Sequence, residues 1–157
     1  MQSKQQKQIK VFLIQTFGGS RGGSLFSRQE KMLDRLIKTA ANRSKNQMKT
    51  LVQTILPRIA LYKVLQAELP AEETFTHMLD WVAAEKHAFT AKMESVPGFY
   101  RIYSYCFLKI MRTSDLWEST QEHDKTHFSA SITKCLWHTA CQENGCPELC
   151  PLFCDVD

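Results

Sequence analysis

The chain has 157 residues, of which 43% are hydrophobic and 23% charged, and this balance excludes a disordered, collagen-like or fibrous protein. The net charge of +4 is modest and owes much to Lys4, Lys7 and Lys10, so it does not indicate a nucleic-acid-binding protein. Every apolar run is far shorter than the roughly 20 residues that span a bilayer, and none resembles a secretory signal. We therefore expect a cytoplasmic protein without a membrane segment.

The first 28 residues are polar and show no sustained hydrophobic periodicity. They contain four glycines, at positions 18, 19, 22 and 23, but no Gly-Lys-Ser/Thr follows, so a phosphate-binding loop is not indicated. We expect residues 1–28 to form a flexible arm and residues 29–157 to form a single domain, since a chain of this length can bury one core.

Apolar residues at helical spacing predict four helices after the arm. The first covers residues 28–41, and the second starts at Met48 and continues with a kink at Pro57. The third has a stripe from Phe75 to Met93 and ends at Pro97 and Gly98. The fourth starts at Phe99 and reaches Ile110; its aromatic content would also suit a strand, but the spacing favours a helix.

Beyond this point the hydrophobic period changes from helix to strand. Residues 128–133 alternate between apolar and polar, and a partner strand is expected around residues 116–121, with turn-forming residues between them. Two short helices should follow, over Leu136–Glu143 and from Pro147 through Cys154. The predicted fold class is α+β, with a helical N-terminal two thirds packed on a small antiparallel sheet and short cysteine-rich helices at the C-terminus.

The six cysteines are distributed unevenly. Cys106 stands alone, whereas five cysteines fall between positions 135 and 154, which argues against a disulfide framework that staples a secreted fold. A local cluster of this kind indicates reactive thiols, a metal site or small buried side chains. These three interpretations stay open on spacing alone.

The end of the cluster could bind a metal or present a reactive thiol. Cys150 and Cys154 share one face of the last helix, and Cys146 extends this row just before the helix. The three-residue gaps would permit a zinc site with His138 as a fourth ligand. No Cys-x-x-Cys pair occurs, so the spacing is permissive rather than diagnostic. Cys146 lies beside a helix start, where the pKa of a thiol is lowered.

Three short segments carry a resemblance to a known family. They are Ile-Thr-Lys-Cys at 132–135, Glu-Asn-Gly-Cys-Pro-Glu-Leu at 143–149 and Phe-Cys-Asp-Val-Asp at 153–157. In order and spacing they resemble the L-2-amino-thiazoline-4-carboxylic acid hydrolase family. The specific part covers about 25 residues.

The resemblance implies a hydrolase that opens a cyclic, amidine-like thiazoline by adding water at the carbon between nitrogen and sulfur, which yields N-carbamoyl-L-cysteine. This chemistry needs an activated water or thiolate, an acid for the departing group and a cation for the substrate carboxylate. On the family pattern, Cys135 and Cys154 are the thiols, Asp157 is the acid and Lys134 is the cation. His138 is a further candidate base or substrate-binding residue. The expected partner is a small-molecule substrate, without a cofactor.

One departure from the family pattern leaves other functions open. Members continue past the Phe-Cys-x-x-Asp segment, whereas this sequence stops at Asp157, so we expect a domain that lacks the last family segment. A sheet that loses an edge in this way favours a homo-oligomer. The alternatives to a hydrolase are a metal-binding or redox-responsive cysteine module and an inactive helical interaction protein.

Overall fold

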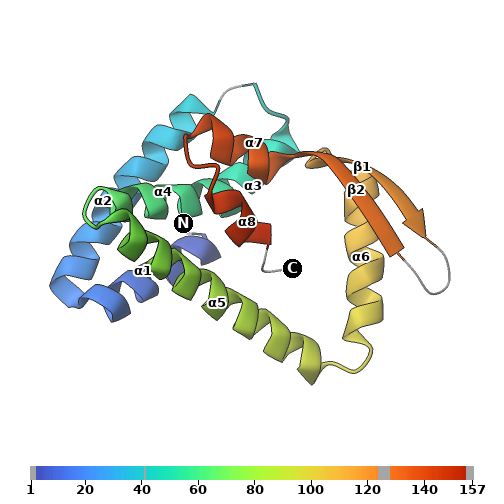
Figure 1. Ribbon diagram of the computed structural model, residues 1–157, viewed down its shortest axis with the longest axis horizontal. Helices are drawn as coiled ribbons and strands as arrows, with labels where there is room; N and C mark the ends of the chain where they lie inside the picture. Colours follow the sequence, from blue (N-terminus) through green and yellow to red (C-terminus); the bar gives the residue numbers. More distant parts are fainter. Residues whose placement is uncertain (1–2, 41, 124–127, 155–157) are drawn as a thin grey trace.

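The computed structural model of the chain describes residues 3–40, 42–123 and 128–154. It consists of helices that wrap around one another, with a two-stranded antiparallel hairpin at one end (Figure 1). The elements in chain order are α1 (Lys4–Phe17), α2 (Gly19–Thr39), α3 (Lys45–Thr50), the π-helix η1 (Leu51–Ile55), α4 (Leu56–Gln66), α5 (Ala71–Ser95), α6 (Phe99–Thr113), β1 (Trp117–His123), β2 (Phe128–Cys135), α7 (Leu136–Glu143) and α8 (Leu149–Cys154). The predicted α+β class is confirmed.

The N-terminal segment is helical, so the expectation of a flexible arm over residues 1–28 was wrong. Helix α1 buries Ile9 and Leu13 completely and packs against α2 and α4. The apolar periodicity was hidden because two core positions on these helices are polar. Gln6 and Gln29 are buried, and their side-chain amides hydrogen-bond to each other at 2.9 and 3.0 Å. Each amide thus has a hydrogen-bond partner inside the core, which reduces the cost of burying it.

The sharp turn between α1 and α2 brings the two helix backbones very close together. Gly18 has a φ of 81°, a conformation that suits glycine. Four residues later, a Cβ on Gly22 would lie 2.4 Å from the carbonyl oxygen of Leu13. Gly22 is therefore required by the crossing of α1 and α2.

The predicted kink at Pro57 appears as a π-helical turn. The backbone is π-helical over η1, and Pro57 lies in the first turn of α4. Proline lacks a backbone N–H and its ring crowds the preceding turn, and a wider π turn relieves that crowding without ending the helix. Helix α4 continues directly into the centre of the molecule, where nearly all of its side chains are buried.

The two helices predicted around Pro97 and Gly98 are confirmed. Helix α5 ends at Ser95, and Gly98, with a φ of 71°, turns the chain into α6. Helix α6 runs to Thr113, so the helical spacing outweighed its aromatic content. Of the α6 side chains that the structure describes, only Met111 is buried.

The predicted hairpin is also confirmed. Strands β1 and β2 pair from Trp117 opposite Cys135 to His123 opposite Phe128, with an irregularity between Glu118 and Ser119. The predicted turn includes residues 124 and 125, which lie outside the described residues. The hairpin contacts α6 through β1 and α7 through β2, so it joins the C-terminal helices to the rest of the fold.

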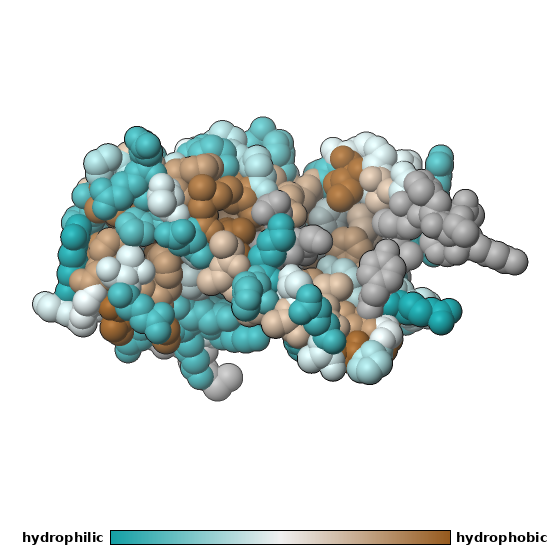
Figure 2. Space-filling view, turned by 60° about the horizontal axis from the view of Figure 1, so that its bottom comes forward, coloured by the Kyte–Doolittle hydropathy of each residue, from teal (hydrophilic) through white to brown (hydrophobic). Residues whose placement is uncertain are grey.

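The main core lies between α1, α2, η1, α4, α5, α7 and α8. On the face in Figure 2, hydrophobic side chains appear as several separate patches among polar ones. Among the described helices, none is long and apolar enough to cross a membrane. Helices α7 and α8 pack on this core, which places the cysteine-rich segment against α4 and α5 (Figure 1).

Candidate active site

The cysteine-rich segment is shaped by two local turns. Cys135 ends β2 and precedes α7 in extended conformation, and its carbonyl oxygen accepts a hydrogen bond from the Thr139 hydroxyl. At the other end of α7, Gly145 has a φ of 66° and reverses the chain. The backbone N–H of Cys146 then donates to the carbonyl of Cys141 at 2.9 Å. This reversal stacks α8 beside α7 and brings their cysteines together.

Cys141 and Cys146 form a buried thiol pair. Both side chains are fully buried and they hydrogen-bond to each other. The interaction between the two thiols raises the pKa of Cys141 and lowers the pKa of Cys146, with nearby Lys63 adding to the second effect. The Cys146 thiol also donates to the backbone carbonyl oxygen of Cys141 at 3.5 Å. Cys146 has the lowered pKa that was expected, but the cause is its interaction with Cys141 rather than a helix start, and its side chain is fully buried.

Cys150 lies at the centre of the remaining thiols. Burial raises its pKa to about 12, with further contributions from Cys154, to which it is hydrogen-bonded, and from Cys135. Cys135 and Cys154 are therefore both near the same buried sulfur. Of the five C-terminal cysteines, only these two are accessible: Cys154 is exposed and Cys135 is partly exposed, and all are free thiols.

The other residues suggested by the family resemblance are placed differently. Lys134 is exposed on β2, and its ammonium forms an ion pair with Glu118 at 2.9 Å. Its side chain points away from that of Cys135, because consecutive residues of a strand face opposite sides. His138 is exposed on α7, whose buried side consists of Leu136, Ala140 and Cys141. Asp157 lies outside the described residues, so its convergence with the thiols stays a prediction.

The structure gives no preformed geometry for the metal alternative. Within residues 3–40, 42–123 and 128–154, no three His, Cys, Asp or Glu side chains are grouped so that they could hold a metal ion. The ligand set of Cys146, Cys150, Cys154 and His138 is therefore not assembled. The reason is visible in the burial pattern, since Cys146 points into the core while His138 points to solvent.

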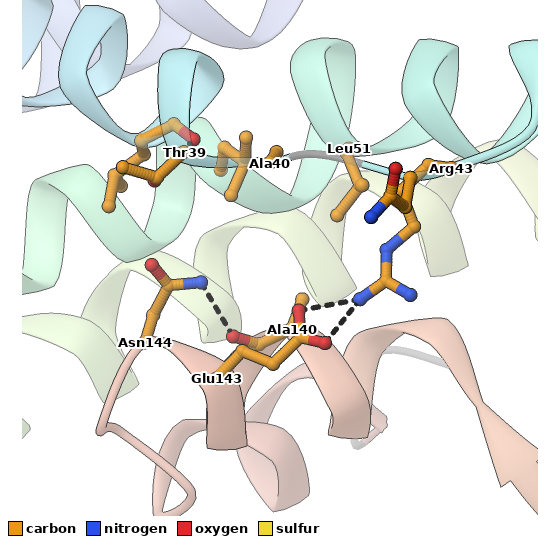
Figure 3. A pocket seen from close by; sticks show the side chains of 10 residues that line it. Thr39, Ala40, Arg43, Leu51, Ala140, Glu143 and Asn144 are labelled. Atoms are coloured by element: carbon orange, nitrogen blue, oxygen red, sulfur yellow. Dashed lines mark hydrogen bonds and ion pairs between the residues drawn. The ribbon is translucent and has the colours of Figure 1, made fainter.

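Two polar contacts hold the segment in place. The hydroxyl of Tyr62 on α4 donates to a carboxylate oxygen of Glu148 at 2.6 Å; burial and this hydrogen bond raise the pKa of Tyr62 to about 12. Arg43, between α2 and α3, donates to both carboxylate oxygens of Glu143 at the end of α7 (Figure 3). The Arg43 contact crosses a pocket of about 420 Å³, so this pocket is spanned by an ion pair that fastens α7 to the helical body.

Sequence reasoning missed a buried arginine beside the cysteine-rich segment. Arg58, in the first turn of α4, is only 9% exposed, donates to Glu85 of α5 at 2.8 Å and lies over the ring of Phe153 at 5.3 Å. The carboxylate of Glu85 also accepts from the Gln5 side chain at 3.0 Å. The sequence did contain an indication of this residue, because Arg58 is the single charge inside the apolar run Ile55–Tyr62. An arginine buried in such a run needs a charged partner.

Comparisons with known proteins agree with the resemblance of the C-terminal motifs. The family model for L-2-amino-thiazoline-4-carboxylic acid hydrolase matches residues 45–157, from the start of α3 through the cysteine-rich segment. Searches among curated proteins and among solved structures gave no significant match. Because the matched region covers well over half of the chain, the protein belongs to the L-2-amino-thiazoline-4-carboxylic acid hydrolase family.

Proposed function

We propose that the protein hydrolyses 2-amino-thiazoline-4-carboxylate or a close analogue, opening the ring to an N-carbamoyl-cysteine product. The family membership supports hydrolysis of a small cyclic substrate. The observation that carries the proposal is the accessibility of the thiols. Cys135 and Cys154 are the two cysteines that fall on the family pattern, and they are the two of the five clustered cysteines that are not buried.

Cys154 is the proposed nucleophile. The ring carbon between nitrogen and sulfur belongs to an amidine-like group and is electrophilic. A bond from the Cys154 sulfur to this carbon forms, the ring C–S bond breaks, and the departing sulfur takes up a proton to become the thiol of the product. Water then attacks the same carbon, the bond to Cys154 breaks, and the net result is the addition of one water molecule.

The neighbouring groups have supporting roles in this proposal. Cys135 is the second accessible thiol near Cys150, and Asp157 is the acid suggested by the resemblance for the departing sulfur. The raised pKa of Cys150 keeps that neighbour protonated and available as a hydrogen-bond donor to a Cys154 thiolate.

The test is turnover by the reduced full chain. L-2-amino-thiazoline-4-carboxylate is incubated with the protein, and the product is identified by a mass gain of one water and by a new free thiol. Cys154→Ser should lower kcat/KM by at least about 100-fold, because serine is a far weaker nucleophile at neutral pH. Cys106→Ser, which changes an exposed cysteine on α6, should leave kcat/KM unchanged.

Two results contradict the proposal. Turnover that survives in Cys154→Ser would remove the nucleophile from this mechanism. If the wild-type chain binds no thiazoline and opens no ring, the inactive interaction protein becomes the better description of this family member.

A further inference from the structure

A second pocket includes Arg58, the buried arginine that contacts the cysteine-rich segment. It has a volume of about 570 Å³ and is formed by the start of α1, by η1 and α4, and by the second half of α5. Most of the residues that line it are polar, and Ala88 and Phe89 of α5 are the apolar ones. The side chains that matter for its chemistry are Lys4, Gln53, Thr54, Arg58, Glu85 and Lys92.

Arg58 is the buried charge of this pocket. Its guanidinium uses one nitrogen for Glu85, while its Nε is buried and has no hydrogen-bond partner among the described residues. An unpaired buried donor on a charged group is costly, so Arg58 has an unused donor that an additional acceptor would satisfy. Each carboxylate oxygen of Glu85 already accepts one hydrogen bond, one from Gln5 and the other from Arg58, and neither bond involves the Nε of Arg58.

The remaining charges favour an anion. Three basic residues line the pocket and only one acidic residue does. The start of α1 also faces the pocket, and it has no acidic residue in its first turn to offset the positive end of the helix dipole. A planar carboxylate matches the fork of an arginine, and Gln53 and Thr54 provide further polar groups for a small ligand.

One aromatic contact joins the pocket to the cysteine-rich segment. The guanidinium of Arg58 lies over Phe153, which is buried in α8. Phe153 and Cys150 are three residues apart and therefore share a face of that helix. A ligand held by Arg58 would thus lie within the same part of the molecule as the proposed nucleophile, which follows Phe153 directly in the chain.

We propose that this pocket is the carboxylate-binding subsite for a small amino-acid-derived ligand and that Arg58, assisted by Lys92, is the cation that positions it. This inference rests on the proposed function for the identity of the substrate. It replaces Lys134 in that role, because Lys134 is 63% exposed and already paired with Glu118, and an ion pair in water contributes little to binding. A buried guanidinium interacts more strongly with a carboxylate.

The experiment measures binding separately from turnover. The probe is L-thiazolidine-4-carboxylate, a saturated ring that has no amidine to hydrolyse, and its methyl ester serves as the neutral counterpart; both are titrated into the full chain by calorimetry. We expect the ester to bind at least about 10-fold more weakly than the acid. Arg58→Lys, which keeps the charge but loses the fork, should weaken binding of the acid by about 10-fold and leave the ester unaffected.

Lys92→Gln provides a second variant in case replacement of Arg58 disturbs folding. Lys92 is exposed on α5, and its replacement should weaken acid binding by about 3-fold, whereas Lys31→Gln on the exposed side of α2 should not change it. Equal affinity for acid and ester would overturn the inference. So would unchanged acid binding in both Arg58→Lys and Lys92→Gln, or a loss of acid binding in Lys134→Gln.

The failure of this inference and the failure of the proposed function give different results. Acid-selective binding that depends on Arg58, without ring opening of the thiazoline, would support the subsite and contradict the hydrolase. Ring opening with a KM unchanged in Arg58→Lys and Lys92→Gln would support the hydrolase and contradict the subsite. Both proposals together predict that Arg58→Lys raises KM more than it lowers kcat.

Discussion

Single cysteine side chains differ greatly in their access to solvent. Cys106 and Cys154 are exposed, whereas Cys141 and Cys146 are fully buried and Cys150 is nearly so. The sequence shows only a row of similar thiols, because the spacing of the cysteines does not reveal which of them the chain reversal at Gly145 turns inward. The packing of α7 and α8 therefore determines which thiols are accessible to solvent.

This difference predicts an order of thiol modification. In the folded protein at pH 8, iodoacetamide should label Cys106 and Cys154 first, and Cys141 and Cys150 last, because these two are buried and have raised pKa values. Peptide mass spectrometry at increasing times measures the order, and unfolding in guanidinium should abolish it. Labelling of Cys150 as fast as Cys154 would contradict the burial of the cluster.

Tyr62 gives a prediction about pH. Its pKa is raised from 10.0 to about 12 in the folded protein, first by burial and then by the hydrogen bond to Glu148. The protonated phenol therefore stabilises the fold fully below pH 10, and this contribution is lost as the pH rises from about 10 to about 12. Tyr62→Phe should lower the free energy of unfolding at pH 7 by about 1 kcal/mol and remove this part of the alkaline loss.

The measurement for Tyr62 is urea unfolding at several pH values between 7 and 11. Tyr105→Phe is the matched control, since Tyr105 is 69% exposed on α6. The control should keep the pH dependence of the wild type. An identical alkaline loss in Tyr62→Phe would show that Tyr62 does not cause it.

Among the secondary-structure elements, α1 and α2 depend on one close approach. Gly22→Ala should lower the free energy of unfolding by several kcal/mol, because the new methyl group would meet the backbone of Leu13 and Ile14 at 2.4–2.7 Å. Gly23→Ala is the control one residue further along α2, where a Cβ meets nothing within 4 Å. Alanine there should stabilise the helix by up to about 1 kcal/mol.

Thermal unfolding followed by circular dichroism separates the two glycine variants. A melting temperature that falls in Gly22→Ala and does not fall in Gly23→Ala is the expected result. Equal melting temperatures in the two variants would mean that the helices do not cross closely at Gly22.

The predictability of each element follows from its hydrophobic pattern. Helix α5 and the hairpin were predicted because their apolar residues repeat with periods of about 3.6 and 2. Helix α1 was missed because Gln6 faces the core, and α2 began earlier than predicted because its glycines appeared to be loop residues. The π turn before Pro57 could not be predicted, since a proline in a helical stripe indicates a disturbance but not its form.

The whole molecule has a well-packed part and a loosely attached part. Helices α2 and α4 lie in the main core, whereas α6 and the hairpin bury few side chains and connect through a continuous row of aromatic contacts. The row runs through Phe89, Phe99, Tyr103, Phe107, Trp117 and Trp137.

Hydrogen exchange should show that these two parts differ in local stability. The amides of α6, β1 and β2 should exchange through an opening of lower free energy than those of α2 and α4, because their opening exposes less buried apolar surface. Mass spectrometry of peptides after timed exchange measures the difference. Protection of α6 equal to that of α4 would contradict this division.

At this scale the site was only partly predictable. The motifs located the thiols because their residues are contiguous in the sequence. Arg58 and Glu85 were not identified, because their contact joins residues 27 positions apart and the pocket around them also includes residues of α1 and η1. A site assembled from helices that are distant in the sequence leaves no local motif, so only the three-dimensional structure identifies it.

The joint between the hairpin and α7 also has an optical consequence. Trp117 and Trp137 stack with ring centroids 5.2 Å apart and planes 9° from parallel. Two indoles at this separation share their electronic excitations, so their ultraviolet circular dichroism contains a paired signal that neither ring gives alone. The native chain therefore carries a label-free spectroscopic reporter at the contact between the hairpin and the first of the cysteine-rich helices.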